Sequence, residues 1–429
     1  MKRIFKASLA VFAAASLTLG LAACTGGGKE AGGETGGDKG TQAGGTITFQ
    51  TWSLKNDRFT PYFEKLIADF EKENPGTTIK WLDQPGEGYE AKILQQANSN
   101  ELPDVVNLPP EFAYKLAKVG KLNDLEAADS AILNDYVKGG VEAYKFPDVE
   151  GSYGYPWYLG TDLNWWNLEQ FKKAGLDESR IPKSGDELFA LAEEIAAKTN
   201  GEVKIISESP KMGTMSNAGI TMFKDGKWVF HTPEAEKLIG QYAAAFKSGA
   251  MPAEALTGDW LGNSASYKQG KVAWTTASAG YASELEKDAP SLLAATKVTP
   301  RFGQSPLFVQ GISVAKESKS PELALKFAQY VTNDANQVAF LKIARGFFPG
   351  TKASNENPAV LLEGITNELQ KTATEEAAKT VTTAYLENPI QYTQEMDKYF
   401  QQQVSLAVRG DISPAEALEK AQKYCNDQM

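Results

Sequence analysis

Residues 46–82 read TITFQTWSLKNDRFTPYFEKLIADFEKENPGTTIKWL, a stretch with the pattern of a strand–helix–strand unit. Ile47 and Phe49 alternate with polar residues, which predicts a first strand over 46–50. A helix follows, with Thr60 as its expected N-cap and Pro61 at its first position, where a missing N–H costs nothing. Its apolar residues recur at helical spacing, at Phe63, Leu66, Ile67 and Phe70. Residues 74–76, Asn-Pro-Gly, end the helix, and residues 79–82 form a second short strand.

The same alternation continues outward from this unit. Residues 89–98 are predicted to form a helix, and residues 104–107, Asp-Val-Val-Asn, a buried strand. Strand, helix, strand, helix, strand is the pattern of right-handed parallel crossovers. Later helices are indicated by N-cap signals, at Ser184, Thr232, Ser320 and Ser413. The sequence therefore predicts an α/β protein with more helix than strand.

The 429 residues include 8 Trp but only 1 His and 2 Cys, and this scarcity excludes several kinds of site. A zinc site of His and Cys needs three or four ligands, so we expect no metal. Nucleophile schemes that depend on His could use only His231, and the phosphate-loop, nucleophile-elbow and zinc-protease motifs are absent. We therefore expect no catalytic residue and no cofactor. Carboxylates are plentiful, however, so composition alone leaves a glycosidase with a pair of acids open.

The net charge is −10, and it becomes more negative when residues 1–23 are set aside. That segment carries Lys2, Arg3 and Lys6 and no acid, so the remainder has 41 basic and 54 acidic residues, a net charge of −13. Affinity for nucleic acid comes mostly from Lys and Arg on phosphates. We therefore expect no nucleic acid partner, and the negative charge serves solubility.

The first 45 residues are predicted to be a targeting segment and a tether. Residues 1–23 combine the basic start with an apolar run too short to span ~30 Å of bilayer, which is typical of a signal peptide. Residues 21–24, Leu-Ala-Ala-Cys, resemble a bacterial lipobox, in which Cys24 is lipidated and becomes the mature N-terminus; a plain signal peptide is the alternative. Residues 25–45 contain 10 Gly in 21 residues, which predicts a flexible linker with a reach of roughly 25 Å. Cys425 is then the remaining thiol, so no intramolecular disulfide is expected.

Aromatic residues gather beside Gly, Pro and polar residues, at expected strand ends and loops. The segments concerned are 155–158, 165–166, 259–260, 280–281 and 346–349. Sugar rings offer apolar faces and outward hydroxyls, so a sugar site needs flat aromatic surfaces with polar groups at the rim. Ordinary packing in the core or in loops is the alternative for each of these aromatic residues.

Read in order, several segments resemble the extracellular solute-binding proteins of carbohydrate ABC importers, the maltose-binding-like superfamily. The resemblance runs from about residue 46 to at least residue 350, over segments 70–79, 102–106, 116–122, 155–156, 166–167, 171–176, 182–188, 267–273, 280–281, 311–316 and 320–331. The chain departs from the family pattern at Trp166, where Tyr is usual, at Trp274 in place of Met, and at Tyr281 in place of Trp.

The resemblance implies a two-lobed fold of the periplasmic-binding-protein kind, with a hinge and a ligand cleft between the lobes. The segments before the lobes are the signal peptide, residues 1–23, and the lipidated Cys with its tether, residues 24–45. The first lobe is expected over 46–155 and 312–350, and the second over 156–311 and 351–429. The chain is expected to cross between the lobes near 155–160, near 300–312 and again after about 350.

The resemblance also implies candidate ligand-binding residues, which follow expected strand ends or flank the crossings. They are Trp52, Glu111, Trp157, Tyr158, Asp259, Trp260, Ser278, Tyr281, Phe308, Gln310, Arg345 and Phe347. Asn56, Asp162 and Asn164 are weaker candidates.

The function that the resemblance implies is a lipid-anchored binding protein on the outer face of a bacterial membrane. It would capture a sugar, expected to be an oligosaccharide, and deliver it to ABC-transporter permease subunits. The protein itself is expected to be a monomer. No nucleotide-binding motif is present, so ATP hydrolysis would belong to another subunit. A polyol or glycerol-phosphate binding protein is one alternative, and an extracellular glycoside hydrolase or a surface adhesion protein is another.

Overall fold

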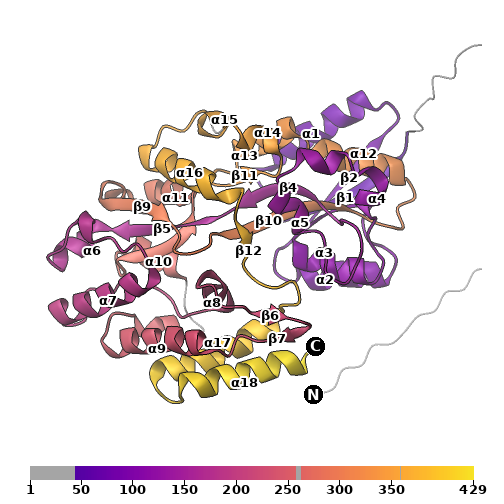
Figure 1. The fold of residues 1–429 in the computed structure, drawn as a ribbon. Helices are drawn as coiled ribbons and strands as arrows, with labels where there is room; N and C mark the ends of the chain where they lie inside the picture. Colours follow the sequence, from indigo (N-terminus) through magenta and orange to yellow (C-terminus); the bar gives the residue numbers. More distant parts are fainter. Residues whose placement is uncertain (1–43, 258–261, 358) are drawn as a thin grey trace, which may run out of the picture. The chain divides into compact units, whose positions relative to one another are not determined.

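A computed structural model of the chain describes residues 44–257, 262–357 and 359–429 (Figure 1). Its strands form two main sheets. The first sheet runs in the order β11 (Phe348–Pro349), β4 (Tyr155–Gly160), β10 (Pro306–Val314), β3 (Val105–Leu108), β1 (Thr46–Trp52) and β2 (Thr78–Gln84), with β12 (Tyr385–Leu386) beside β10. The second runs in the order β8 (Trp274–Ser278), β5 (Asp162–Asn167) and β9 (Thr296–Pro300). A separate hairpin pairs β6 (Phe223–Lys224) with β7 (Lys227–Trp228).

The first strands and helices confirm the predicted alternation. β1 pairs in parallel with both β2 and β3, and the connections are α1 (Thr60–Glu73) and α2 (Tyr89–Asn98). Of the apolar side chains that set the pattern, those of Ile47, Phe49, Phe63, Leu66 and Phe70 are buried. Phe49 packs edge-on against Phe327 with ring centroids 5.3 Å apart. One detail was wrong, because Phe59 is the N-cap of α1 and Thr60 lies inside the helix without capping it.

The remaining helices cover the two sheets. Between β3 and β4 lie α3 (Pro110–Lys118), α4 (Leu125–Asp129), η1 (Ile132–Asp135) and α5 (Lys138–Glu142). Between β5 and β9 lie α6 (Leu168–Lys173), η2 (Glu178–Arg180), α7 (Gly185–Thr199), α8 (Met212–Asn217), α9 (Pro233–Lys247), η3 (Ala253–Leu256), α10 (Asn263–Lys268), α11 (Tyr281–Asp288) and η4 (Pro290–Ala295). After β10 come α12 (Pro321–Val331), α13 (Asp334–Leu341), α14 (Lys352–Asn355), α15 (Ala359–Leu362), α16 (Glu368–Val381), α17 (Gln394–Arg409) and α18 (Pro414–Asp427).

Three of the four N-caps expected for the later helices are confirmed. Ser184, Thr232 and Ser413 each accept a hydrogen bond from the backbone N–H three residues later, at 3.1–3.3 Å. Ser320 stands at the expected position before Pro321, but its side chain makes no capping hydrogen bond. A side-chain cap satisfies one of the backbone N–H groups that a helix start leaves unpaired, which explains why the sequence signal locates these helices well.

Two short segments connect strands of the first sheet to strands of the second. Thr161 alone separates β4 of the first sheet from β5 of the second. Residues 301–305 separate β9 from β10, which is antiparallel to β4. β12 adds to the start of β10 before the chain continues into α17 and α18, which pack beside α9 (Figure 1).

The buried apolar side chains form three clusters, one of which joins side chains of α2, β3 and α3 to side chains of β5, α11 and α16. In the first lobe, buried side chains of β1, α1, β10 and α12 pack together. In the second, α7 and α9 pack with α17 and α18, and the buried free thiol of Cys425 lies in this core. None of the helices in the described residues has the length and apolarity that crossing a bilayer requires.

Gln337 of α13 ties together three backbone segments of the first lobe, although its side chain is fully buried. Its Nε2 donates to the carbonyl oxygens of Pro156 and Thr332, at 3.0 and 2.6 Å. Its Oε1 accepts from the N–H of Gly350 at 2.5 Å. The side chain therefore satisfies backbone groups that have no access to water.

We expect Gln337→Leu to lower the free energy of unfolding by about 3 kcal/mol, because it leaves buried backbone groups without partners. Urea denaturation followed by Trp fluorescence measures this loss. Gln269→Leu, at the exposed end of α10, is the matched control and should change stability by less than about 0.5 kcal/mol. Equal losses in the two variants would contradict the role given to Gln337.

Candidate functional site

The crossing at Thr161 brings an exposed aromatic surface beside a group of charged residues. Phe308 is the cross-strand partner of Gly160, and Phe347 lies so close that a Cβ on Gly160 would come within 3.2 Å of its ring. Phe308 and Phe347 are 41% and 36% exposed, which is unusual for Phe. In the part of the chain that the structure describes, no other Phe, Tyr or Trp ranks among the exposed large apolar residues.

Tyr158 completes this aromatic cluster, which we define as Tyr158, Phe308 and Phe347. Its ring meets Phe347 edge to face, with centroids 5.0 Å apart and planes at 61°. In β4, Tyr158 pairs with Gln310 of β10 on one side and with Pro349 of β11 on the other. Tyr158 and Phe308 are thus held by the paired strands β4 and β10, and Phe347 directly precedes β11.

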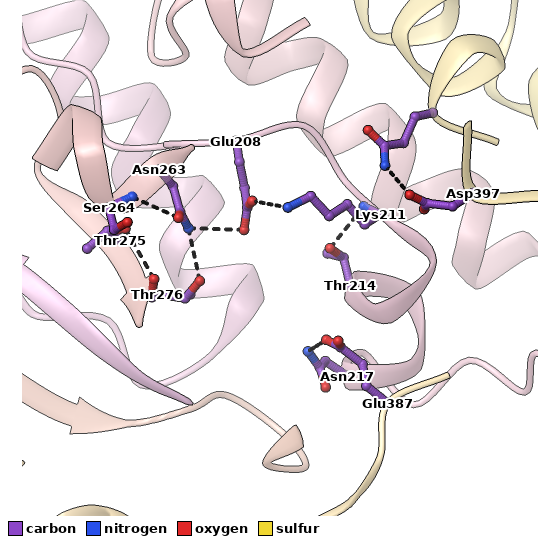
Figure 2. A network of polar contacts seen from close by, with 11 residues as sticks. Glu208, Lys211, Thr214, Asn217, Asn263, Ser264, Thr275, Thr276, Glu387 and Asp397 are labelled. Carbon is purple, nitrogen blue, oxygen red and sulfur yellow. Dashed lines mark hydrogen bonds and ion pairs between the residues drawn. The ribbon is translucent and has the colours of Figure 1, made fainter. Parts of the chain in front are cut away.

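On the far side of Thr161 lies a polar cluster, which we define as Asp162, Glu208, Lys211, Asn217, Arg301 and Glu387. Figure 2 shows how its hydrogen bonds connect Glu208, Lys211 and Asn263, and how Glu387 meets Asn217. Lys211 Nζ lies 2.8 Å from Glu208 Oε2, and Asn263 Nδ2 donates to Glu208 Oε1 at 3.1 Å. These groups come from α8, from α10 and from the loop before α8.

Glu387 reaches the polar cluster from the segment after β12. Asn217 Nδ2 donates to Glu387 Oε1 at 2.9 Å, and the Tyr385 hydroxyl donates to Asn217 Oδ1 at 2.9 Å. The carboxylate packs directly on Gly213, where a Cβ would lie 2.2 Å from Glu387 Cδ. Burial raises the pKa of Glu387, and Arg301 acts in the opposite direction.

Asp162 and Arg301 are the least satisfied members of the polar cluster. No described residue donates a hydrogen bond to the Asp162 carboxylate, and Arg301 Nε is buried with no hydrogen-bond partner among the described residues. Burial raises the pKa of Asp162 to about 6 from its ordinary 3.8. Arg301 and Lys211 oppose this rise, while Glu387 and Glu208 add to it. A ligand hydroxyl between the two groups could donate to the carboxylate and accept from the guanidinium.

A cavity of about 350 Å³ borders both clusters. Glu111, Phe308 and Gln310, all predicted from the sequence, line it together with Glu387. Asn107 Nδ2 donates to Gln310 Oε1 at 3.0 Å and so fixes the orientation of this amide. Glu111 lies in the first turn of α3, and although its side chain reaches solvent, hindered hydration raises the pKa of its carboxyl. Ser278 is the cross-strand partner of Asp162 and lies at the other side of the crossing.

Several other predicted site residues occupy different positions. Trp157 has no exposed surface and stacks on Phe340, with ring centroids 4.7 Å apart. Tyr281 is 2% exposed and donates its hydroxyl to the carbonyl of Ser264. Because a ring without accessible surface offers no face to a ligand, we treat both as packing residues and correct the expectation that they contact it.

Trp52 and Arg345 are intermediate cases. Trp52, at the end of β1, is partly buried and stacks on Tyr89 with centroids 5.5 Å apart, so one ring face is already covered. Arg345 is partly buried in a recess beside Phe347. Asp259 and Trp260 lie outside the described residues. The weaker candidates Asn56 and Asn164 bond to the local backbone and to Trp274 respectively, which are structural roles.

Sequence reasoning missed five members of the polar cluster, namely Glu208, Lys211, Asn217, Arg301 and Glu387. They come from three separate stretches of the chain, and of the five only Asn217 is buried. The available signal was weak: Glu208 and Lys211 flank Ser209-Pro210 in a stretch without a periodic pattern, and Glu387 precedes Asn388-Pro389. Such stretches are typical of loops, where binding residues concentrate.

Comparison with known proteins gives a consistent set of relatives. A family model described as bacterial extracellular solute-binding protein matches residues 65–387. The multiple sugar-binding protein of Streptococcus mutans is 28% identical over 154 residues, which are 35% of this chain and 34% of that protein. The maltodextrin-binding protein MdxE of Bacillus subtilis is 26% identical over 371 residues, 79% of each chain. The putative ABC transporter periplasmic-binding protein YcjN of Escherichia coli is 27% identical over 210 residues. The chain spans 48% of the length of YcjN and 34% of the length of the Streptococcus mutans protein.

The fold has close counterparts among solved structures. The cyclic α-maltosyl-1,6-maltose binding protein from Arthrobacter globiformis superposes with a TM-score of 0.72 at 18% sequence identity. The superposition covers 90% of this chain and 99% of that one. At this level of identity the likeness concerns the fold, and it confirms the predicted two-lobed α/β architecture.

We expect the stability of the protein to fall as the pH rises from about 4 to about 6, because folded Asp162 holds its proton more tightly than the unfolded chain does. Asp162→Asn should remove this contribution, so that the variant gains stability relative to the wild type above pH 6. Urea midpoints measured between pH 4 and pH 7.5 check this. Asp57→Asn, at an exposed position, serves as control. A pH-independent difference between Asp162→Asn and the wild type would refute the assignment.

Proposed function

The chain belongs to the bacterial extracellular solute-binding proteins, and we propose that the solute it binds is an oligosaccharide. The family assignment rests on a match that covers residues 65–387. It confirms the resemblance found in the sequence, and it identifies the chain as a binding protein rather than an enzyme. The choice among solutes rests on the chemistry of the site.

The observation that carries the proposal is the aromatic cluster beside the polar cluster. Phe308 and Phe347 present apolar surface to solvent, and Asp162 follows two residues after Gly160, which the Phe347 ring and the Phe308 Cβ approach. A pyranose has CH-rich faces that pack on aromatic rings and hydroxyls that bond to carboxylates, amides and guanidinium groups. Both kinds of surface are available within one site, and the named function of MdxE, maltodextrin binding, agrees with this reading.

The charge of the polar cluster argues against a phosphorylated polyol. Asp162, Glu208 and Glu387 contribute three carboxylates, and Lys211 and Arg301 contribute two cations. Lys211 is already paired with Glu208. A phosphate group would therefore meet an excess of negative charge, which is unfavourable in a partly desolvated site. A neutral sugar carries no such penalty.

We further propose that the two lobes close over the ligand by a hinge and that the closed form delivers it to ABC-transporter permease subunits. The hinge would consist of Thr161, residues 301–305 and the segment after β12. Because β4 and all of β10 pair within the first sheet, we propose lobe boundaries at Thr161 and within 301–305, in place of 156 and 311. We expect the protein to act as a monomer.

The proposal includes a lipid anchor at Cys24. That residue, the signal peptide and the tether lie outside the described residues, so the support comes from the lipobox-like residues 21–24 and the Gly-rich stretch 25–45. A tether of roughly 25 Å would let the lobes reach a permease while the lipid holds the protein at the outer face of the membrane.

We expect linear oligosaccharides such as maltotriose to raise the melting temperature by several degrees, because a ligand at a hundredfold excess over its Kd stabilises the folded state by about 2.7 kcal/mol. A panel of mono-, di- and oligosaccharides with glycerol and glycerol 3-phosphate tests this by differential scanning fluorimetry. Glycerol 3-phosphate should give no shift. If every saccharide fails, or only the phosphate succeeds, the proposed solute class is wrong.

The same titration locates the site. Phe347→Ala and Phe308→Ala should each weaken the saccharide that binds best by about tenfold, since each removes a stacking face. Their melting temperatures without ligand should stay near the wild-type value, because both side chains are exposed. Val119→Ala, which truncates an exposed apolar side chain beyond α3, is the matched control and should leave affinity unchanged.

We expect Cys24→Ala to abolish lipid attachment and to release the protein into the medium. Metabolic labelling of an expressing Gram-positive host with an alkyne fatty acid, followed by fractionation, measures both effects. Cys425→Ala is the control and should remain labelled, because this thiol is buried in the second lobe. Absence of label from the unaltered chain would favour a plain signal peptide.

A further inference from the structure

Two of the segments proposed for the hinge, residues 301–305 and the stretch that follows β12, both meet Asn217, the last residue of α8. Gly303, in the first of these segments, has a left-handed backbone with a φ of +66°. A Cβ at this position would collide with the carbonyl oxygen of Asn217. A side chain there would therefore push the segment away from α8, and the close approach depends on glycine.

The side chain of Asn217 holds the other segment. Its Oδ1 accepts a hydrogen bond from the Tyr385 hydroxyl at 2.9 Å. Its Nδ2 donates to Glu387 Oε1 at 2.9 Å, as Figure 2 shows. Asn217 is buried, so both ends of its amide need partners within the protein, and these two residues supply them. One amide therefore fixes the stretch from Tyr385 to Glu387.

Gly213 adds a second contact on the same face of α8. It lies four residues before Asn217, and residues at this spacing are neighbours on a helix surface. Its backbone lies so close to the Glu387 carboxyl group that a Cβ would collide with it. At the start of the helix, Lys211 pairs with Glu208 at 2.8 Å. α8 therefore connects the polar cluster, at its start, with the two hinge segments, at its end.

The two hinge segments are also joined to each other. The Tyr385 N–H donates to the carbonyl oxygen of Ser305 at 3.2 Å, and β12 pairs with the start of β10. β10 is in turn paired with β3 and β4 of the first sheet. α8, in contrast, packs with the core that contains α7 and α9. Asn217 is therefore a point at which the second lobe is hydrogen-bonded to segments held by the first.

We propose that Asn217 is a positioning residue of the hinge, whose amide sets the angle at which the second lobe rests against the first. Without this amide, the Tyr385 hydroxyl and the Glu387 carboxylate lose their shared partner, and the lobes sample a wider range of angles. A ligand that contacts both lobes must then order them on binding, which lowers its affinity. The effect on affinity rests on the proposed function, whereas the effect on the hinge is testable without any ligand.

The first test measures the distance between the lobes in the ligand-free chain. Nitroxide labels on Lys92→Cys in α2 and Ala190→Cys in α7, both at exposed positions, report this distance by double electron–electron resonance. The chain also carries Cys24→Ala, and the thiol of Cys425 is buried and should stay unlabelled. We expect Asn217→Leu to widen the distribution of distances about twofold.

Asn426→Leu is the matched control. Asn426 of α18 also uses both ends of its amide, because it accepts from the Trp228 N–H at 2.9 Å and donates to the Trp228 carbonyl at 3.0 Å. These bonds lie within the second lobe, so their loss should leave the distribution at its wild-type width. If Asn217→Leu does not fold, Gly303→Ala is the second variant and should widen the distribution, because it separates residues 301–305 from α8.

Asn217→Asp adds a pH signature that a loss of stability alone would not produce. The new carboxylate still accepts from Tyr385 but faces the carboxylate of Glu387, so the distribution should be wide at pH 7.5. At about pH 5 the two carboxylates share a proton, and the O–H replaces the Nδ2 donor, so the width should return to the wild-type value. Comparison with the wild type at each pH removes the effects of the other charged groups that act on Glu387, which are Arg301, Glu208 and Lys211.

The second test connects the hinge with solute capture. It uses calorimetry with maltotriose, or with whichever saccharide of the panel stabilises the wild type more. The affinity should fall about tenfold in Asn217→Leu, because the ligand must order the lobes, and should stay near the wild-type value in Asn426→Leu.

The outcomes separate this proposal from the proposed function. An unchanged width in Asn217→Leu, an equal widening in Asn426→Leu, or no narrowing of Asn217→Asp in acid overturns the positioning role even if saccharides bind. A widening specific to the Asn217 variants, without binding of any saccharide, would support the role in the hinge and overturn the oligosaccharide proposal. A specific widening with unchanged saccharide affinity would overturn the link between Asn217 and solute capture.

Discussion

The antiparallel pairing of β4 with β10 is the constraint on which the candidate site depends. These strands are neighbours in the first sheet, with Phe308 opposite Gly160 and Gln310 opposite Tyr158. Because they run in opposite directions, the end of β4 and the start of β10 must lie together, and so must the segments that join them to β5 and β9. Asp162 begins β5 and Arg301 directly follows β9, so this arrangement brings both residues to the crossing. β12 pairs with the start of β10, which brings Glu387 to the same place.

This arrangement explains why the site is both apolar and charged. On the side of the first sheet, the aromatic cluster lies at β4, β10 and the residue before β11. On the side of the second sheet, the polar cluster supplies carboxylates and cations. The charge of Arg301 acts on Asp162 and lowers its pKa, but the two side chains form no ion pair within 4 Å in the described part of the chain. Their hydrogen-bonding capacity therefore remains available to a third partner. A solute with hydroxyls is well suited to bridge such groups.

Prediction from sequence succeeded where the signal was local. The strand–helix alternation over 46–108 and the caps at Ser184, Thr232 and Ser413 depend on residues close together in the chain, and they are confirmed. It was less successful where burial decides the role. Trp157 and Tyr158 are adjacent and chemically similar, yet the first is fully buried and the second only partly, because successive strand residues point to opposite faces.

The sequence by itself determined the class of fold, the family and the candidate tether, because periodicity, caps and ordered motifs are written along the chain. It also indicated that aromatic residues near the crossings matter, without separating ligand contacts from core. Only the tertiary structure decided that Phe308 and Phe347 are exposed, that Trp157 and Tyr281 are buried, and that Glu208 and Glu387 lie near Asp162. The physical reason is that burial and charge proximity depend on contacts between residues far apart in the chain, and no local pattern encodes those contacts.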